Sequence, residues 1–120
     1  MKKRKESLTG ETWKVKTECG NVFVTLNEQD ETLYEINIQL GKSGNCQRGL
    51  LYLNSVQISK ILQACETKDV KRFIKKHYLK FSCGCPFLHK GETYLSCIHW
   101  VGGKMLEKIK EEEKNEKTQA

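Results

Sequence analysis

The chain has 120 residues, of which 38% are hydrophobic and 30% are charged, and its formal net charge is +6. A chain of this length forms one hydrophobic core, because it buries roughly two thirds of the surface that its unfolded form exposes. The composition is too apolar for a disordered chain, and no stretch approaches the roughly 18 to 20 consecutive apolar residues of a membrane-spanning helix. We therefore expect one small, soluble domain, and we exclude a membrane protein.

Both ends of the chain are expected to be flexible, with the folded domain at residues 11–110. Residues 1–10 form a basic tail with four positive charges up to Lys5, and no apolar segment of a signal peptide follows them. Residues 111–120 form a charged tail of lysines and glutamates. Without a secretory signal we expect the cytoplasm, where thiols stay reduced and clustered cysteines are more often metal ligands or catalytic groups than disulfides.

Three runs with alternating or β-branched side chains predict β-strands at 13–17, 22–26 and 34–40. The first two runs are separated by residues 19–21 (Cys-Gly-Asn), which are typical of a turn and predict a hairpin with a cysteine at its corner. The polar residues 27–31 predict a second turn. Three strands joined by short turns indicate an antiparallel meander, which needs a covering layer on its apolar face.

The second half of the chain supplies this covering layer, so the predicted fold class is α+β. It is a three-stranded antiparallel meander covered by two or three C-terminal helices. Apolar residues recur at helical spacing in 47–65, and we expect that side of the helix, including Leu50 and Leu53, to lie on the sheet. The other predicted helices are 68–78, with Thr67 as its N-cap, and a segment capped by Ser96 whose apolar stripe ends at Ile109.

Four of the six cysteines stand at predicted turns or helix starts, where a fold can gather distant residues at one point. Helix N-termini also favour the thiolate, which is the form that binds metal. Four thiolates at about 2.3 Å from a zinc ion complete a structural tetrahedral site. The spacing lacks the paired C-x-x-C motif of a zinc ribbon. The residues alone therefore do not decide between metal binding and disulfides. The four are Cys19, Cys46, Cys85 and Cys97.

Several motifs in a fixed order carry a resemblance to a known family. They are residues 17–27 and 35–46, Cys85-Pro86 followed by Gly91, and the segment 95–97 (Leu-Ser-Cys). In these segments the chain resembles the TSCPD domain, a cysteine-bearing module found at the C-terminus of cobalamin-dependent (class II) ribonucleotide reductases and as small free-standing proteins. The family's four cysteine positions fall on the four cysteines named above, which implies a zinc site that staples the fold.

Two departures from the family pattern bear on this site. Ile98-His99 stands where the family's motif ends in Pro-Asp, so the family's acidic residue has no counterpart here. Cys83 is an additional thiol two residues before Cys85, and either could be the third ligand, although the following proline favours Cys85. His89 and His99 lie near the predicted site and are alternatives to one thiolate.

A second candidate site stands at the entrance to the first predicted helix. Lys42 and Ser43 lie in a glycine-containing turn, although the pattern lacks the complete phosphate-loop motif. Free backbone amides there, together with Lys42 and Arg48, are suited to an anionic group, and Trp100 or Phe87 is a candidate aromatic contact for a nucleotide-like ligand. The plain alternative is a tight turn that positions the neighbouring cysteine.

The residues do not suggest an enzyme, because no serine or cysteine has an identifiable base and a four-cysteine zinc has no open position for water. The predicted function is a small zinc-binding accessory module, related to the reductase C-terminal domain, that docks a protein, a nucleotide or a nucleic acid. One alternative is a thiol redox module that uses Cys83 and Cys85 to serve a reductase. Another is a free-standing protein that captures a nucleotide-like ligand. The oligomeric state is left open, a homodimer included.

Overall fold

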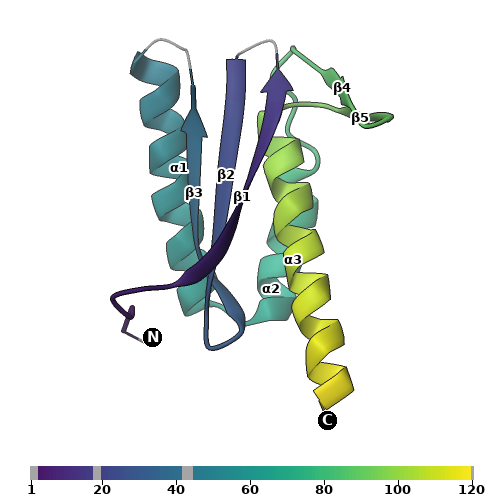
Figure 1. The fold of residues 1–120 in the computed structure, drawn as a ribbon. Helices are drawn as coiled ribbons and strands as arrows, with labels where there is room; N and C mark the ends of the chain where they lie inside the picture. Colours follow the sequence, from purple (N-terminus) through teal and green to yellow (C-terminus); the bar gives the residue numbers. More distant parts are fainter. Residues whose placement is uncertain (1–2, 18–19, 42–44, 120) are drawn as a thin grey trace.

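The computed structural model describes residues 3–17, 20–41 and 45–119, and their side chains except those of 45, 46 and 116–119. The chain forms an α+β fold in which an antiparallel sheet of three strands, in the order β1-β2-β3, is followed by helices and a two-stranded hairpin (Figure 1). The predicted fold class is confirmed at this level. The elements are β1 (Thr9–Thr17), β2 (Gly20–Gln29), β3 (Thr32–Leu40), α1 (Asn45–Ala64), α2 (Thr67–Phe73), the π-helical turn η1 (Ile74–Tyr78), β4 (Phe87–His89), β5 (Glu92–Tyr94) and α3 (Cys97–Gln119).

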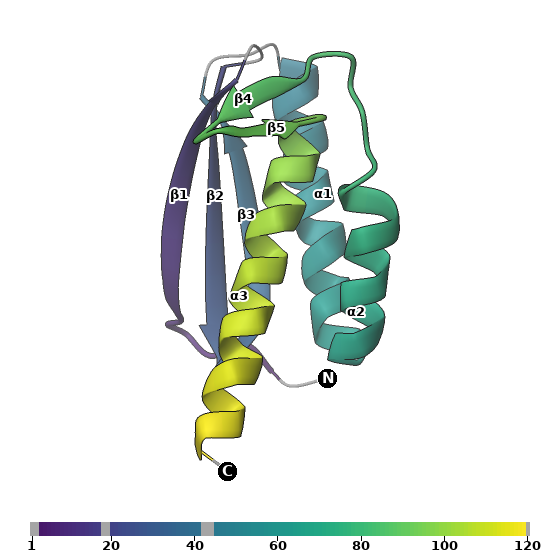
Figure 2. The same cartoon turned by 90° about the vertical axis from the view of Figure 1, so that its right-hand side faces the viewer.

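One face of the three-stranded sheet forms the hydrophobic core. Successive strand residues point to opposite faces, and Val22, Val24 and Leu26 of β2 are buried while the residues between them are partly exposed. Val15 pairs with Val22 and Val24 pairs with Ile38, so the buried side chains of the three strands form one apolar surface. Helices lie on this side of the sheet (Figure 2). Their buried apolar residues are Ile58, Val70, Ile74, Tyr78, Trp100, Val101, Met105 and Ile109.

The helix α1 lies beside the edge strand β3 (Figure 1). Ser55 Oγ accepts a hydrogen bond from the Ile38 N–H group at 2.7 Å, and Ser59 Oγ accepts one from the Ile36 N–H group at 2.9 Å. These hydroxyl groups thus accept hydrogen bonds from backbone N–H groups that otherwise have no partner strand at the edge of a sheet. The side chains of α1 therefore close one edge of the sheet.

This position of α1 corrects the prediction that Leu50 and Leu53 lie on the sheet. Leu50 is 66% exposed and Leu53 is 50% exposed, although both belong to the apolar pattern that predicted the helix. The side of α1 that faces β3 instead carries Ser55 and Ser59, with Ile58 buried between them. Serine hydroxyls decide the orientation because backbone N–H groups buried without partners would cost free energy.

Two boundaries differ from the sequence prediction. Thr67 is the first helical residue of α2, so the N-cap position falls on Glu66, whose side chain makes no capping hydrogen bond. The segment 80–94, between the second and third predicted helices, contains the short hairpin of β4 and β5, in which Phe87 pairs with Tyr94. Strands of three residues are too short for an alternating pattern to reveal them.

The prediction that Ser96 caps α3 is confirmed. Ser96 Oγ accepts a hydrogen bond from the His99 N–H group at 3.0 Å, as an N-cap side chain does. The Ser96 hydroxyl also donates to Phe81 O at 2.7 Å, which ties the helix start to the preceding loop. α3 then continues through the charged segment to Gln119, beyond the apolar stripe that predicted it.

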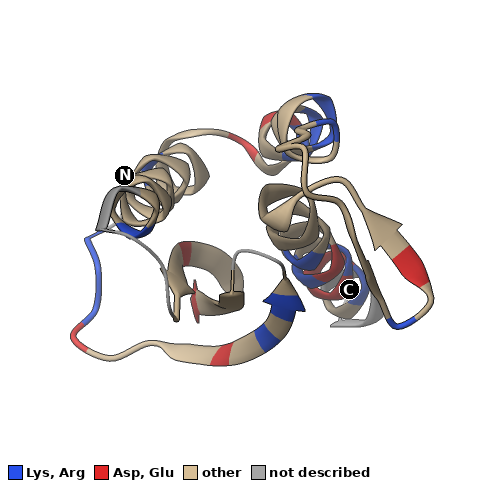
Figure 3. Cartoon of the chain, turned by 90° about the horizontal axis from the view of Figure 1, so that it is seen from above, with Lys and Arg blue, Asp and Glu red and all other residues tan. Residues whose placement is uncertain are grey.

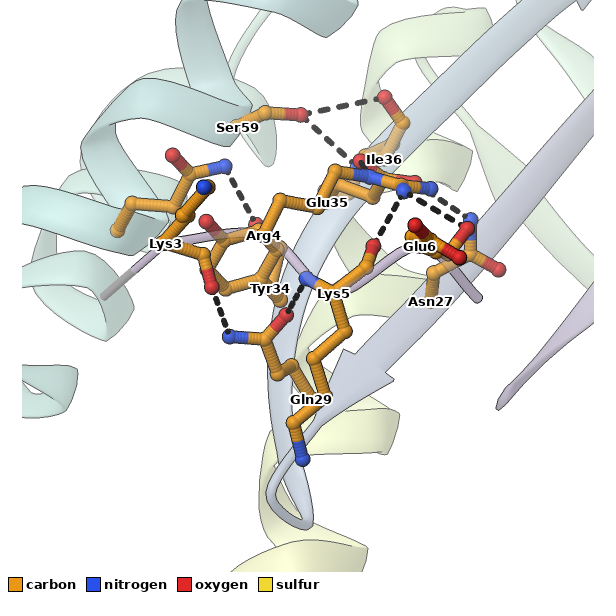
Figure 4. A network of polar contacts seen from close by, with 11 residues as sticks. Lys3, Arg4, Lys5, Glu6, Asn27, Gln29, Tyr34, Glu35, Ile36 and Ser59 are labelled. Carbon is orange, nitrogen blue, oxygen red and sulfur yellow. Dashed lines mark hydrogen bonds and ion pairs between the residues drawn. The ribbon is translucent and has the colours of Figure 1, made fainter. Parts of the chain in front are cut away.

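The basic segment before β1, predicted as part of a flexible tail, contacts the sheet (Figure 4). The Arg4 guanidinium donates hydrogen bonds to both Glu35 carboxylate oxygens at 2.8 and 2.9 Å, and this interaction lowers the pKa of Glu35. The Gln29 side chain accepts a hydrogen bond from the Lys5 N–H group at 2.8 Å and donates one to Lys3 O at 3.0 Å. These contacts place the segment beside β2 and β3.

α3 and η1 approach each other closely at Gly102. A Cβ atom on Gly102 would lie 2.6 Å from Tyr78 Cβ and 3.4 Å from Ile74 Cγ2, whereas a Cβ atom on Gly103 would meet nothing within 4 Å. The Cβ atom of Tyr78 is fixed by the backbone of η1 and cannot rotate away. Glycine at 102 therefore permits the contact between the two helices, and Gly103 offers a matched control.

We expect Gly102→Ala to lower the free energy of unfolding by about 1 to 3 kcal/mol, because the added methyl group overpacks the contact between α3 and η1. Gly103→Ala should raise it by about 0.5 to 1 kcal/mol, because alanine forms helices better than glycine. Urea denaturation of the two variants and the parent chain measures both changes. Equal effects of the two substitutions would contradict close packing at Gly102.

Candidate metal centre

Described segments that flank the predicted cysteine ligands lie at one end of the molecule. Figure 1 shows the end of β1, the start of β2, the end of β3, the start of α1, the hairpin of β4 and β5 and the start of α3 at this end. A backbone hydrogen bond of 2.8 Å from the Gly41 N–H group to Asn21 O joins the end of β3 to the start of β2. The fold thus brings together segments that are far apart in the sequence.

Cys97 is the first residue of α3, and its side chain contacts the end of β1. The thiol donates a hydrogen bond to Thr17 Oγ1 at 3.5 Å, and the Thr17 hydroxyl donates to Gly20 O at 2.9 Å. Thr17 therefore lies beside the Cys97 thiol, and Gly20 lies beside Thr17. The N-terminus of a long helix favours a thiolate there, because its N–H groups and dipole stabilise negative charge.

Cys83 and Cys85 lie between η1 and β4, on either side of Gly84. The φ angle of Gly84 is 82°, in the left-handed region that glycine adopts at little cost. The Cys83 thiol is exposed and lies 3.9 Å from the carbonyl oxygens of Cys85 and Leu95, whereas Cys85 is half-buried. Because Leu95 is two residues before Cys97, this loop lies next to the start of α3.

The structure therefore places three cysteines, Cys83, Cys85 and Cys97, in neighbouring segments. In the part of the chain that the structure describes, no three His, Cys, Asp or Glu side chains form a group that could hold a metal ion. Cys19 and the side chain of Cys46 lie outside the described residues. The four-cysteine site stays a prediction, and the described segments indicate at which end of the fold it would lie.

The two histidines predicted as alternative ligands make other contacts. His99 Nδ1 accepts a hydrogen bond from the Leu95 N–H group at 3.0 Å, and its ring lies 5.1 Å from that of Tyr94, measured between centroids. Burial lowers the pKa of His99, which favours the neutral ring. The His89 ring packs edge-on against Trp100 at a centroid distance of 6.4 Å.

The other predicted site residues are described only in part. Lys42 and Ser43 lie outside the described residues, and Arg48 is exposed in the first turn of α1. Trp100 is only 1% exposed, so it lies in the core, and its contact with a ligand stays a prediction. Cys65, the last residue of the predicted helix 47–65, is exposed and follows the last residue of α1.

A polar cluster that the sequence did not indicate lies near the β2–β3 turn, at the end opposite the hairpin of β4 and β5 (Figure 1). Glu112 Oε1 accepts a hydrogen bond from the Leu33 N–H group at 3.1 Å, and Glu112 Oε2 is buried. This burial and the neighbouring Glu28 raise the pKa of Glu112 to about 7, against the opposing effects of Leu33 and Lys108. Lys108 Nζ lies 3.3 Å from Glu28 Oε2. The charged residues of this segment had suggested a solvated tail. The sequence therefore did not indicate that an oxygen of the Glu112 carboxyl group is buried.

The architecture defines a small α+β domain whose cysteine-bearing connections lie at one end. The chain belongs to the TSCPD domain family, which it matches over residues 1–110, so the resemblance noted in the sequence is confirmed. The family is related to domains of ribonucleotide reductases. No curated protein and no solved structure matches the chain at a significant level. Among the helices of the described residues, none has the length and apolar character needed to cross a membrane.

The raised pKa of Glu112 predicts a pH dependence of stability. Its native pKa of about 7 exceeds the ordinary value of 4.5, so folding favours the protonated carboxyl group. The favourable contribution is full below the ordinary pKa and is lost as the pH rises through about 7. We expect Glu112→Gln to have little effect at pH 4.5 and to raise the free energy of unfolding by about 1 to 2 kcal/mol at pH 8, after allowance for solvent screening.

Urea denaturation at several pH values between these limits measures this effect. Glu111→Gln is the matched control, because Glu111 is the exposed neighbour on the same helix. An effect of Glu112→Gln that is the same at every pH would contradict the titration of a buried Glu112. So would an equal effect of Glu111→Gln.

Proposed function

We propose that the protein is a zinc-binding, non-catalytic docking module. Cys19, Cys46, Cys85 and Cys97 would hold the ion as four thiolates. The observation that carries this proposal is the position of Cys97 beside Thr17, next to the segment that contains Cys19. Membership of a family related to reductase domains supports an accessory role.

Zinc suits this set of donors because it prefers tetrahedral sites with thiolate ligands at about 2.3 Å. A reducing compartment such as the cytoplasm would keep the thiols available for the ion. Four thiolates leave no open position for water or substrate, so the ion would be structural. Its role would be to hold chain connections in place.

The small core explains why such a cross-link would matter. The mean hydropathy of the chain is -0.62, and among the described side chains of the long helix α3 the last buried apolar residue is Ile109. Metal binding to an otherwise unformed site adds its free energy to that of folding. A zinc ion would join the first hairpin, the start of α1, the loop after η1 and the start of α3.

Cys85 is the better candidate for the third ligand. It is half-buried, and Pro86 after it restricts the backbone. Cys83 is exposed, and its thiol is directed to carbonyl oxygens. In the redox alternative Cys83 would pair with Cys85, but a disulfide across one intervening residue is strained.

We expect the purified protein to contain one zinc ion per chain by mass spectrometry. Cys85→Ser and Cys97→Ser should remove this stoichiometric zinc and lower the melting temperature by more than about 10 °C, because the metal contributes to folding. Cys65→Ser is the matched control, since Cys65 is exposed outside the candidate centre. Cys83→Ser should also keep the ion.

Two other outcomes would change the proposal. Loss of zinc in Cys83→Ser, with zinc kept in Cys85→Ser, would make Cys83 the third ligand. A protein purified without zinc, in which Cys83 and Cys85 undergo reversible two-electron oxidation, would contradict the metal centre and favour the redox alternative. Titration of the thiols with and without a chelator distinguishes these cases.

A further inference from the structure

Helices α1 and η1 border an apolar groove on the surface, which we call the α1–η1 groove. Two hollows form it, with volumes of about 470 and 560 Å³. Asn54, Phe73 and Tyr78 line both hollows, so the two are continuous. Leu50 and Phe81, which are 66% and 50% exposed, line the first hollow. Large apolar side chains are therefore open to solvent along this groove.

The α1–η1 groove follows α1 from Gln47 to Ile61. At a rise of 1.5 Å per residue this distance is about 21 Å, or about four turns of a helix. A contiguous apolar surface rimmed by polar residues is a candidate interaction site. Its apolar lining comes from several elements and includes Leu50, Leu51, Ile61, Phe73, Phe81 and Ile98.

The groove lies in the part of the chain that carries the positive charge. Residues 36–91 contain 10 Lys or Arg and only 2 acidic residues, whereas the rest of the chain contains 11 and 13. α1 has no acidic residue, and blue segments on α2 are visible in Figure 3. Lys60 lines the groove, and the exposed Lys76 and Lys80 each precede a residue that lines it. The margin of the apolar groove is therefore basic.

We infer that the α1–η1 groove docks an acidic amphipathic helix of a partner protein. Apolar side chains at helical spacing would pack against Leu50 and Phe81, in the manner of helix-in-groove recognition. Glutamate or aspartate on the flanks of that helix would face Lys60, Lys76 and Lys80. This inference rests on the docking function proposed above and names the class of partner.

Other occupants fit the groove less well. A nucleic acid needs cations in contact with its phosphates, but the floor of the groove is apolar and its cations stand at the margin. A second copy of the chain would offer the acidic part of α3. Residues 110–115 of that helix contain no apolar side chain that could fill the groove.

The test uses the full chain and two fluorescent 15-residue peptides. Both have leucine at helical spacing, and the remaining positions are glutamate in one peptide and lysine in the other. Fluorescence anisotropy should show at least tenfold tighter binding of the acidic peptide, and added salt should weaken it. Leu50→Ala and Phe81→Ala should each weaken binding about tenfold.

Tyr52→Ala is the matched control. Tyr52 is 58% exposed on the same helix but lines hollows on another side of α1, so its removal should leave binding within about twofold of the parent chain. Circular dichroism shows whether each variant is folded. Lys76→Glu should weaken binding of the acidic peptide, and Lys110→Glu on α3 should not.

Several results would overturn the inference. The first is equal binding of the two peptides. The second is peptide binding that neither Leu50→Ala nor Phe81→Ala weakens. The third is binding of a single-stranded oligonucleotide through the groove when neither peptide binds. Zinc is measured in the same samples. Specific peptide binding by a protein without zinc would contradict the proposed metal centre and leave the groove supported. A zinc-loaded protein that binds neither peptide would overturn the groove alone.

Discussion

The hydrogen bonds between the serine hydroxyls of α1 and the outer edge of β3 determine much of this structure. Ser55 and Ser59 hold α1 beside the sheet, and the buried face of the sheet stays available to α3. Apolar residues on the other sides of α1, such as Leu50, therefore remain at the surface. A helix over the sheet would bury such residues and leave β3 open to pairing with another chain. The closed sheet edge and the exposed groove thus have the same cause.

The order of the elements also separates two kinds of chemistry along the molecule. At one end lie the described residues that flank the β1–β2 and β3–α1 connections, and the loop after η1 returns to that end before α3 begins (Figure 1). Cysteines occur in or beside each of these connections. At the other end, the β2–β3 turn meets the second half of α3 through Glu112, Lys108 and Glu28. Cysteine thiols of Cys83, Cys85 and Cys97 lie toward one end, and a partly buried carboxyl group lies toward the other.

The local sequence pattern predicted which segments form strands and helices better than it predicted which side of a helix faces the sheet. Alternation found the three long strands, and Ser96 marked the start of α3, because these signals depend on near neighbours. The side of α1 that faces the sheet was not predictable from apolar spacing, since polar Ser55 and Ser59 occupy it. Trp100, a candidate contact for a ligand, is only 1% exposed, and its burial was not evident from the sequence pattern.

The candidate site was predictable to the extent that turns carry its cysteines. Cys97 and the Cys83–Cys85 loop lie where turns and a helix start were expected, whereas Cys65 and Glu112 depend on tertiary packing that spacing does not encode.

The uneven charge of the chain has one further consequence. With a net charge of +8 on residues 36–91 and -2 on the remainder, the molecule has a permanent electric asymmetry. Such a field orients an approaching polyanion before contact and accelerates its capture, most strongly in dilute salt.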